Sequence, residues 1–222
     1  MVDGVQLGPY LPYLFSGLYD TLLLTAGGLA LGFVLGIMLA FVEMYLPRPL
    51  SSVASAVEQV LRGIPLIVMF FLIYFGFPSL GLVLPPEAAA SLGLGLRSAG
   101  YQSQIFRSTL GSIGMGQVEA ALSIGLGKFA TYREVLLPQA VRLSIPAWSN
   151  EFTVVLKDTS MAYAIGVAEL LKRAANVVAL TLDALQVYLI IAAIYFVATF
   201  AVSRGMNLLY KRWRVPGLGG GG

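Results

Sequence analysis

The sequence contains no cysteine and no histidine. Without cysteine the chain forms no disulfide and no thiolate site. Without histidine it lacks the commonest side-chain ligand of zinc and haem. We therefore expect no metal site in this chain. The redox compartment stays open, because there is no thiol to oxidise.

Charged residues are also scarce. They make up 11% of the 222 residues, whereas soluble domains average about 25%. Hydrophobic residues account for 58%, and the mean hydropathy is +0.82. This composition indicates a multi-pass protein embedded in membrane lipid. The formal net charge is only +3 and the basic residues are scattered, so nucleic acid is not an expected partner.

The hydrophobic pattern predicts an all-α polytopic membrane protein with about five transmembrane helices. A helix that crosses roughly 30 Å of hydrocarbon needs about 20 apolar residues. Three stretches meet this need without any charged residue, namely 21–42, 63–86 and 184–203. In the second of them, proline and glycine indicate that the span ends near residue 75. Two weaker candidates, 88–113 and 141–166, carry charged residues.

The basic residues predict the orientation of these spans, because cytoplasmic segments carry an excess of lysine and arginine. Five spans place the termini on opposite sides. With the N-terminus outside and the C-terminus inside, only Lys172 and Arg173 lie outside. The inner segments then hold Arg48, Arg62, Lys128, Arg133, Arg142, Arg204, Lys211, Arg212 and Arg214. Residues 114–140 are therefore predicted to face the cytoplasm.

A stripe of small residues, spaced by four, marks one face of the first span. It consists of Gly28, Gly32, Gly36 and Ala40, and is called the small-residue stripe below. Such a stripe lets another helix approach closely. We expect it to pack within the subunit; a seam between two subunits is the alternative.

The segment 114–140 carries a spaced motif. Glu119, Ala120 and Ala121 are followed by Gly125 after three residues, and Val-Leu-Leu-Pro, which ends at Pro138, begins nine residues later. This pattern resembles the cytoplasmic Glu-Ala-Ala (EAA) loop of permease subunits of ATP-binding-cassette (ABC) importers.

The resemblance implies a coupling helix that a separate ABC ATPase subunit receives. The small residues would let a short helix fit a partner's groove, with a break between two helical pieces. Glu119 and Arg133 supply charge for docking. The alternative is an amphipathic helix on the membrane surface, which needs bulky apolar side chains and many basic ones. The segment is expected to lack both.

The run Gly125-Leu126-Gly127-Lys128-Phe129 looks like a phosphate loop but lacks two of its required residues. A Walker A loop has a glycine further upstream and serine or threonine after its lysine. Leu122 and Phe129 stand at those positions. The chain is therefore not expected to be an enzyme or to hold a cofactor of its own; ATP with Mg²⁺ is expected in the partner ATPase.

Further stretches resemble the polar amino-acid uptake branch of these permeases, whose members have five spans. They are RGIPLIVMFFLIYFGFP (62–78), YQSQIFR (101–107), SIGMGQVEAA (112–121), NEFTVVLKDTS (150–160) and IGVAELLKRA (165–174). One position departs from the family pattern: Gln104 stands where an acidic residue is usual before Ile-Phe-Arg. A charged role at that position is therefore in doubt.

The fourth span carries the main candidates for substrate binding. Glu151 and Asp158 are seven residues apart and so share one helical face. Two carboxylates on one face can hold an ammonium or guanidinium group, and Asn150, Thr159 and Ser160 can bond a ligand's α-carboxylate. The structural alternative is that Lys157 neutralises either acid and the cluster holds helices together.

On the third span Arg97, Tyr101 and Gln104 form one polar face at i, i+4 and i+7. This face lines a pathway or packs between subunits, and the sequence does not separate the two. Glu58 and Arg62, four apart, are expected to pair along a helix. Pro65 is expected to kink or start the second span, because proline removes a backbone donor.

Residues 166–179 are predicted to form a short amphipathic helix on the outer side, with Glu169 and Arg173 paired at i, i+4. The resemblance implies that an extracytoplasmic substrate-binding protein docks there. Capping of the helix bundle is the alternative use of this helix.

Together these features predict one permease domain over residues 1–215, followed by a flexible glycine-rich tail at 216–222. The predicted function is import of a polar or cationic amino acid across the cytoplasmic membrane, driven by a separate ATPase. A second permease subunit, identical or related, is expected because five spans are few to enclose a pathway. The alternative is an ion-coupled carrier or channel that needs no ATPase.

Overall fold

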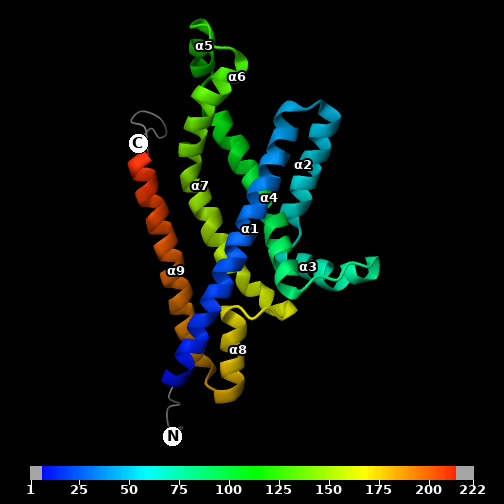
Figure 1. Ribbon diagram of the computed structural model, residues 1–222, viewed down its shortest axis with the longest axis vertical. Coiled ribbons are helices and arrows are strands. Elements are labelled where there is room, and N and C mark those ends of the chain that lie inside the picture. Colours follow the sequence, from blue (N-terminus) through cyan, green and yellow to red (C-terminus); the bar gives the residue numbers. More distant parts are fainter. Residues whose placement is uncertain (1–6, 214–222) are drawn as a thin grey trace.

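The computed structural model describes residues 7–213, which form helices and no strand (Figure 1). In chain order the elements are η1 (Gly8–Tyr10), α1 (Leu11–Tyr45), α2 (Arg48–Gly63), α3 (Leu66–Phe71), η2 (Leu72–Gly76), η3 (Phe77–Leu80), α4 (Pro86–Ser112), α5 (Met115–Ser123), α6 (Lys128–Ala130), η4 (Thr131–Leu136), α7 (Leu137–Asp158), η5 (Thr159–Ile165), α8 (Leu170–Thr181) and α9 (Ala184–Trp213). The predicted all-α class is confirmed. The predicted tail at 216–222 lies outside the described residues.

Two of these helices are long and apolar enough to cross a membrane, Gly8–Tyr45 and Ala184–Trp213. A third crossing is counted if α2 and Leu66–Leu80, which meet at 101°, form one bent span. The helices α4 and α7 carry many polar residues as well as charged ones, and they are not among the helices recognised by hydropathy. Their 27 and 22 residues nevertheless exceed the roughly 20 that a crossing needs.

The small-residue stripe packs against α4 within the same chain, as expected. All four of its residues are buried. A methyl group on Gly28 would come within 2.7 Å of the Leu94 Cβ, and one on Gly32 within 2.7 Å of the Ser98 Cβ. Glycine at these positions therefore sets how closely the two backbones approach. Because later residues of the stripe meet later residues of α4, the two helices run parallel.

The second predicted span is bent at Pro65, between α2 and α3. Ile64 has extended backbone angles (φ −76°, ψ 127°), as expected for a residue that precedes proline. The prediction that Pro65 kinks or starts the span is confirmed. The uncharged run after Pro65 forms three short helical pieces.

The fourth predicted span, 141–166, is not one α-helix. The α-helix α7 ends at Asp158, and the chain continues as the 3-10 helix η5 to Ile165. Gly166 then takes a left-handed conformation (φ +90°), which glycine adopts without a Cβ penalty. The two candidate hydroxyls, Thr159 and Ser160, consequently lie in the tighter helix.

Residues 114–140, called the end segment below, project from one end of the bundle (Figure 1). The C-terminal end of α9 lies toward the same end, whereas α8 and the start of α1 lie at the opposite end. Gly125 separates α5 from α6 with φ +88°, so the predicted break between two helical pieces is present. Pro138 lies at the start of α7, which continues directly from the π-helix η4.

At the opposite end, the predicted pair of Glu169 and Arg173 is wrong. Glu169 is the N-cap of α8, and its carboxylate accepts hydrogen bonds from the backbone N–H groups of Leu171 and Lys172, both at 2.7 Å. A helix that starts at Leu170 leaves these groups without intrahelical partners. Arg173 instead binds Asp20 on α1 at 2.6 Å, which ties α8 to α1.

Glu169 is fully buried, and burial raises its pKa to about 7, against the hydrogen bonds that favour its carboxylate. In an unfolded chain the pKa of a glutamate is about 4.3. Below that pH the Glu169 side chain is protonated in both the folded and the unfolded state, so its ionisation has no effect on stability. As the pH rises toward 7, this glutamate ionises readily only in the unfolded chain, so the free energy of unfolding falls. The fall is complete above about pH 7.

We therefore expect Glu169→Gln to flatten the pH dependence of stability between about pH 4.5 and 7.5. The measurement is the thermal unfolding midpoint of the full chain in mild detergent across this range. The control is Glu134→Gln, since the Glu134 side chain is 63% exposed and should leave the slope unchanged. Equal slopes for wild type and Glu169→Gln would contradict the raised pKa.

Candidate functional site

A polar cavity of about 740 Å³ lies among α1, α4 and α7. It is lined by Glu43, Met44, Tyr101, Gln104, Ile105, Arg107, Ser108, Ala147, Asn150 and Glu151. Four of the seven candidate substrate residues from the sequence meet in its wall: Tyr101, Gln104, Asn150 and Glu151. The other three, Asp158, Thr159 and Ser160, are not among the lining residues.

Glu151 on α7 is 4% exposed and accepts a hydrogen bond from the Ser98 hydroxyl at 2.7 Å. The Gln102 amide donates both to the Ser98 hydroxyl (2.9 Å) and to the Leu29 carbonyl (3.1 Å). This relay from α1 through α4 orients the Ser98 proton toward Glu151. No lysine or arginine of the described residues forms a salt bridge with Glu151.

Asp158 pairs with Arg97 of α4 rather than with Lys157. Lys157 is exposed, because adjacent positions on a helix point about 100° apart. Asp158 thus links α7 to α4 through Arg97, a partner that the sequence analysis did not propose. Among the described residues, Lys157 forms no salt bridge with an acid of this cluster, so the alternative in which it neutralises one is not observed.

Thr159 and Ser160 use their hydroxyl protons locally. The Thr159 hydroxyl donates to the Leu156 carbonyl, and the Ser160 hydroxyl to the Lys157 carbonyl, both at 2.7 Å. A hydroxyl has only one proton, so neither group is free to donate to a ligand carboxylate in this arrangement. Asn150, by contrast, is exposed and lines the cavity.

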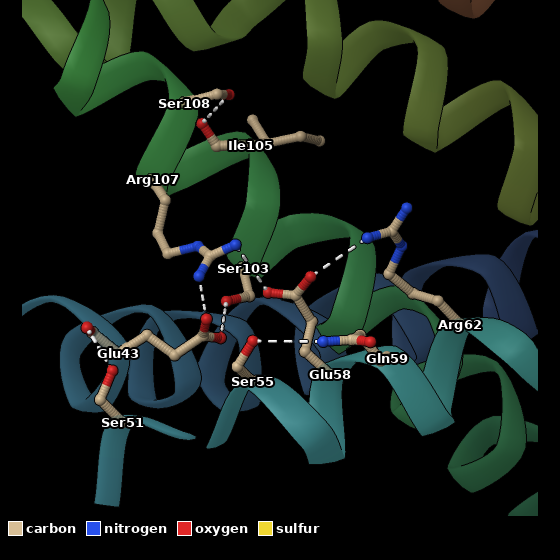
Figure 2. Close-up of polar contacts among 10 residues, drawn as sticks. All are labelled: Glu43, Ser51, Ser55, Glu58, Gln59, Arg62, Ser103, Ile105, Arg107 and Ser108. Carbon is tan, nitrogen blue, oxygen red and sulfur yellow. Dashed lines mark hydrogen bonds and ion pairs between the residues drawn. The ribbon is translucent and has the colours of Figure 1, made fainter. Parts of the chain in front are cut away.

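A second ionic cluster lies beside the cavity, whose lining includes two of its members, Glu43 and Arg107 (Figure 2). Arg107 of α4 lies between two buried carboxylates: it pairs with Glu43 of α1 and, at 3.2 Å, with Glu58 of α2. Glu58 also binds Arg62 at 3.1 Å, which confirms the pair predicted along that helix. The Ser103 hydroxyl lies 3.5 Å from Glu43. One guanidinium thus joins three helices.

Sequence reasoning missed the partnership of Arg107 with Glu43, although a usable signal was present. Both residues are ionisable groups at the edge of otherwise apolar helices, and such groups pair with one another in membrane proteins. Because the two positions are 64 apart in sequence, the pattern gave no indication of which partner each would find.

Tyr101 connects the two clusters. The guanidinium carbons of Arg62 and Arg97 lie 5.1 Å and 4.9 Å from the centre of its ring. Both cations are within the distance at which an aromatic face attracts them. A continuous chain of contacts therefore crosses the bundle through Glu43, Arg107, Glu58, Arg62, Tyr101, Arg97 and Asp158.

Glu151 is the one acid of this region left without a cation. The four carboxylates are Glu43, Glu58, Glu151 and Asp158, and the three guanidiniums are those of Arg62, Arg97 and Arg107. All three guanidiniums pair with acids other than Glu151. A buried carboxylate that borders a cavity and has only a hydroxyl partner is suited to a ligand that carries positive charge.

The end segment presents both charged and apolar groups. Glu119 is exposed and forms no salt bridge with another described residue. Arg133 pairs only with the neighbouring Glu134, at 3.5 Å and with both side chains well exposed. Such a pair contributes little to stability, which leaves Arg133 available to a partner.

The expectation that the end segment lacks bulky apolar groups is wrong. Ile124 and Phe129 are 79% and 76% exposed, and Met115 is 67% exposed. Ala120 is exposed and Ala121 is buried, so one alanine of the motif faces outward and the other faces the chain. An exposed surface that combines apolar and charged groups is typical of a protein contact.

Comparison with known proteins places the chain in a family. The family described as "Binding-protein-dependent transport system inner membrane component" matches residues 32–215. The L-cystine transport system permease protein TcyB of Bacillus subtilis (strain 168) is 37% identical over 202 residues, covering 90% of this chain and 86% of that protein. The glutamine transport system permease protein GlnP of Escherichia coli (strain K12) is 32% identical over 215 residues, covering 96% and 98%.

Solved structures agree. A crystal structure of an amino acid ABC transporter with histidines matches with a TM-score of 0.89 and 36% identity, over 96% of this chain and 99% of that one. The MetNI methionine ABC transporter in an inward-facing conformation matches with a TM-score of 0.78 at 21% identity, over 93% and 99%; at that identity the likeness concerns the fold. The chain belongs to the family of inner-membrane components of binding-protein-dependent transport systems.

Proposed function

We propose that this chain is the permease subunit of an ABC importer that carries a polar amino acid across the cytoplasmic membrane. The observation that carries the proposal is the end segment, whose EAA motif projects from the bundle with exposed Glu119 and Arg133. The chain itself is a transporter component and not an enzyme. ATP and Mg²⁺ would be bound and used by a separate ATPase.

Five crossings with the N-terminus outside and the C-terminus inside belong to this proposal. Because α1 and α4 run parallel, the bent segment from α2 to η3 must bring the chain back across the membrane between them. Contacts of Arg97 with Asp158 and of Ser98 with Glu151 make α7 antiparallel to α4. A hydrogen bond from Tyr195 of α9 to Glu169 (3.0 Å) joins α9 to the N-cap of α8. The crossings then alternate in direction.

The proposed partners follow from the same arrangement. The end segment is the proposed contact for an ABC ATPase. The helix α8, at the opposite end, is the proposed contact for an extracytoplasmic substrate-binding protein. A second permease subunit, identical or related, completes the pathway, since five spans are few to enclose one. An ion-coupled carrier or channel would use the same cavity without an ATPase and leaves the end segment without a role.

The charge balance of the cavity favours one class of amino acid. Glu151 is available for the α-ammonium group, whereas Asp158 is already neutralised by Arg97. Gln104, at the position where an acid is usual in this branch, adds no charge. A zwitterion with an uncharged polar side chain therefore matches the cavity better than a cationic amino acid. The amides of Gln104 and Asn150 are the proposed donors to its α-carboxylate.

We expect Glu119→Arg to weaken binding of the ATPase by about 30-fold or more, because reversing a charge at an interface leaves the partner's group unpaired. The measurement is co-purification of the transporter and its substrate-stimulated ATP hydrolysis. The control is Glu87→Arg, which makes the same change on an exposed acid at the start of α4. Uptake that continues without any ATPase would refute the proposed mechanism.

We expect Glu151→Gln to lower amino-acid uptake by roughly 10- to 100-fold, the value of a hydrogen bond to a charged group, while assembly with the ATPase is unchanged. The measurement is uptake into proteoliposomes together with co-purification. Glu134→Gln serves as the matched control outside the cavity. Normal uptake in Glu151→Gln would return this residue to a structural role.

Gln104→Glu should add a second unpaired carboxylate to the cavity. We expect it to raise the uptake of lysine relative to glutamine by about tenfold, the effect of one favourable charge pair in a partly buried site. Competition between the two labelled amino acids in proteoliposomes measures this ratio. An unchanged ratio would place Gln104 outside the substrate pathway.

A further inference from the structure

A second cavity of about 420 Å³, here called the apolar groove, lies among α1, α4, α7 and α9. Its lining is almost entirely apolar and aromatic, and includes Ala40, Phe106, Ile145, Trp148, Met206 and Trp213. It reaches the end segment through Tyr132, and Met44 lines both the apolar groove and the polar cavity. The apolar groove thus lies between the end segment, which is the proposed ATPase contact, and the polar cavity.

We propose that the apolar groove binds an acyl chain of an anionic phospholipid, whose phosphate is held by Arg142 and Arg212. Each arginine is next in sequence to a lining residue, Val141 or Trp213, and so lies on the flank of the lining face of its helix. Both are exposed, and neither forms a salt bridge with another described residue. Basic groups between transmembrane helices at this level are suited to anionic headgroups.

The volume and the aromatic residues both favour a lipid chain. If a methylene group takes about the share of one water, roughly 30 Å³, the groove accommodates on the order of 14 methylenes. Tyr45, Tyr132 and Trp213 line the groove, and tyrosine and tryptophan concentrate at the level of lipid headgroups. A lipid lying with its chain in the groove and its phosphate beside Trp213 matches this pattern.

A second copy of the chain is a poorer occupant. An α-helix about 10 Å across fills roughly this volume with a single turn, so a spanning helix of a neighbour does not fit the groove. A second copy would also bring the same basic groups to the same level and be repelled.

The sequence supplies a direct reporter of occupancy. Trp148 and Trp213 are the only two tryptophans of the chain, and both line the groove. Bromine atoms on a lipid chain quench tryptophan fluorescence on contact. The full chain would be reconstituted in phosphatidylcholine bilayers that contain a varied fraction of phosphatidylglycerol, with bromine placed on the chains of one lipid or the other.

We expect brominated phosphatidylglycerol to quench far more than its share of the bilayer predicts, with a binding constant about 30-fold above that of phosphatidylcholine. Arg142→Gln with Arg212→Gln should bring this ratio near one, whereas Lys128→Gln, which removes an exposed charge of α6, should not. Ser144→Phe, a lining position, should abolish the preference by filling the groove. Val197→Phe, on the exposed face of α9, should leave it intact.

Two results would overturn the proposal. Quenching of the wild-type chain that follows bulk lipid composition would mean that the groove contacts only surrounding lipid without preference. Weak quenching by both brominated lipids would mean that protein covers both tryptophans. Neither result bears on the proposed transport function, which is measured by uptake.

Discussion

The bundle depends on pairing of buried charges by Arg107. Its guanidinium joins Glu43 of α1 to Glu58 of α2 from its own position on α4. Both carboxylates are almost fully buried, and a buried carboxylate without a partner is costly in a membrane protein. The pairing therefore specifies how α1, α2 and α4 meet at one end of the polar cavity. Arg97 does the same for α4 and α7 through Asp158.

This pairing also gives the cavity its chemistry. Because the three arginines form their salt bridges with Glu43, Glu58 and Asp158, the remaining acid, Glu151, stands at the cavity wall without a salt bridge. Ser98 and Gln102 hold that carboxylate in place by hydrogen bonds. Substrate charge and helix packing are thus linked, since any change in one pairing alters which acid is available to a ligand.

Local features of the sequence predicted much of the fold. Two of the three uncharged runs located the long apolar helices α1 and α9, Pro65 located the bend, and the small-residue stripe located a face of α1 that packs within the subunit. These succeed because each is determined by residues that are close in sequence. The motif around Glu119 identified the end segment for the same reason, although its exposed Ile124 and Phe129 were overlooked.

Features that depend on distant partners were not predictable in this way. Asp158 has Lys157 beside it in sequence but binds Arg97, 61 residues away. Glu169 was paired with Arg173 by helical spacing alone, yet the helix starts at Leu170 and Glu169 is its N-cap. In both cases spacing gave candidates, and only the packing of helices decided between them.

The central claim is that Glu151 is the carboxylate left for the substrate. The most direct measurement is a structure of the assembled transporter with an amino acid bound in the polar cavity. The account predicts the ligand's ammonium group within hydrogen-bond distance of Glu151, with Arg97 still on Asp158 and Arg107 still on Glu43 and Glu58. A ligand that binds Asp158 after displacing Arg97, or that leaves Glu151 without contact, would contradict it.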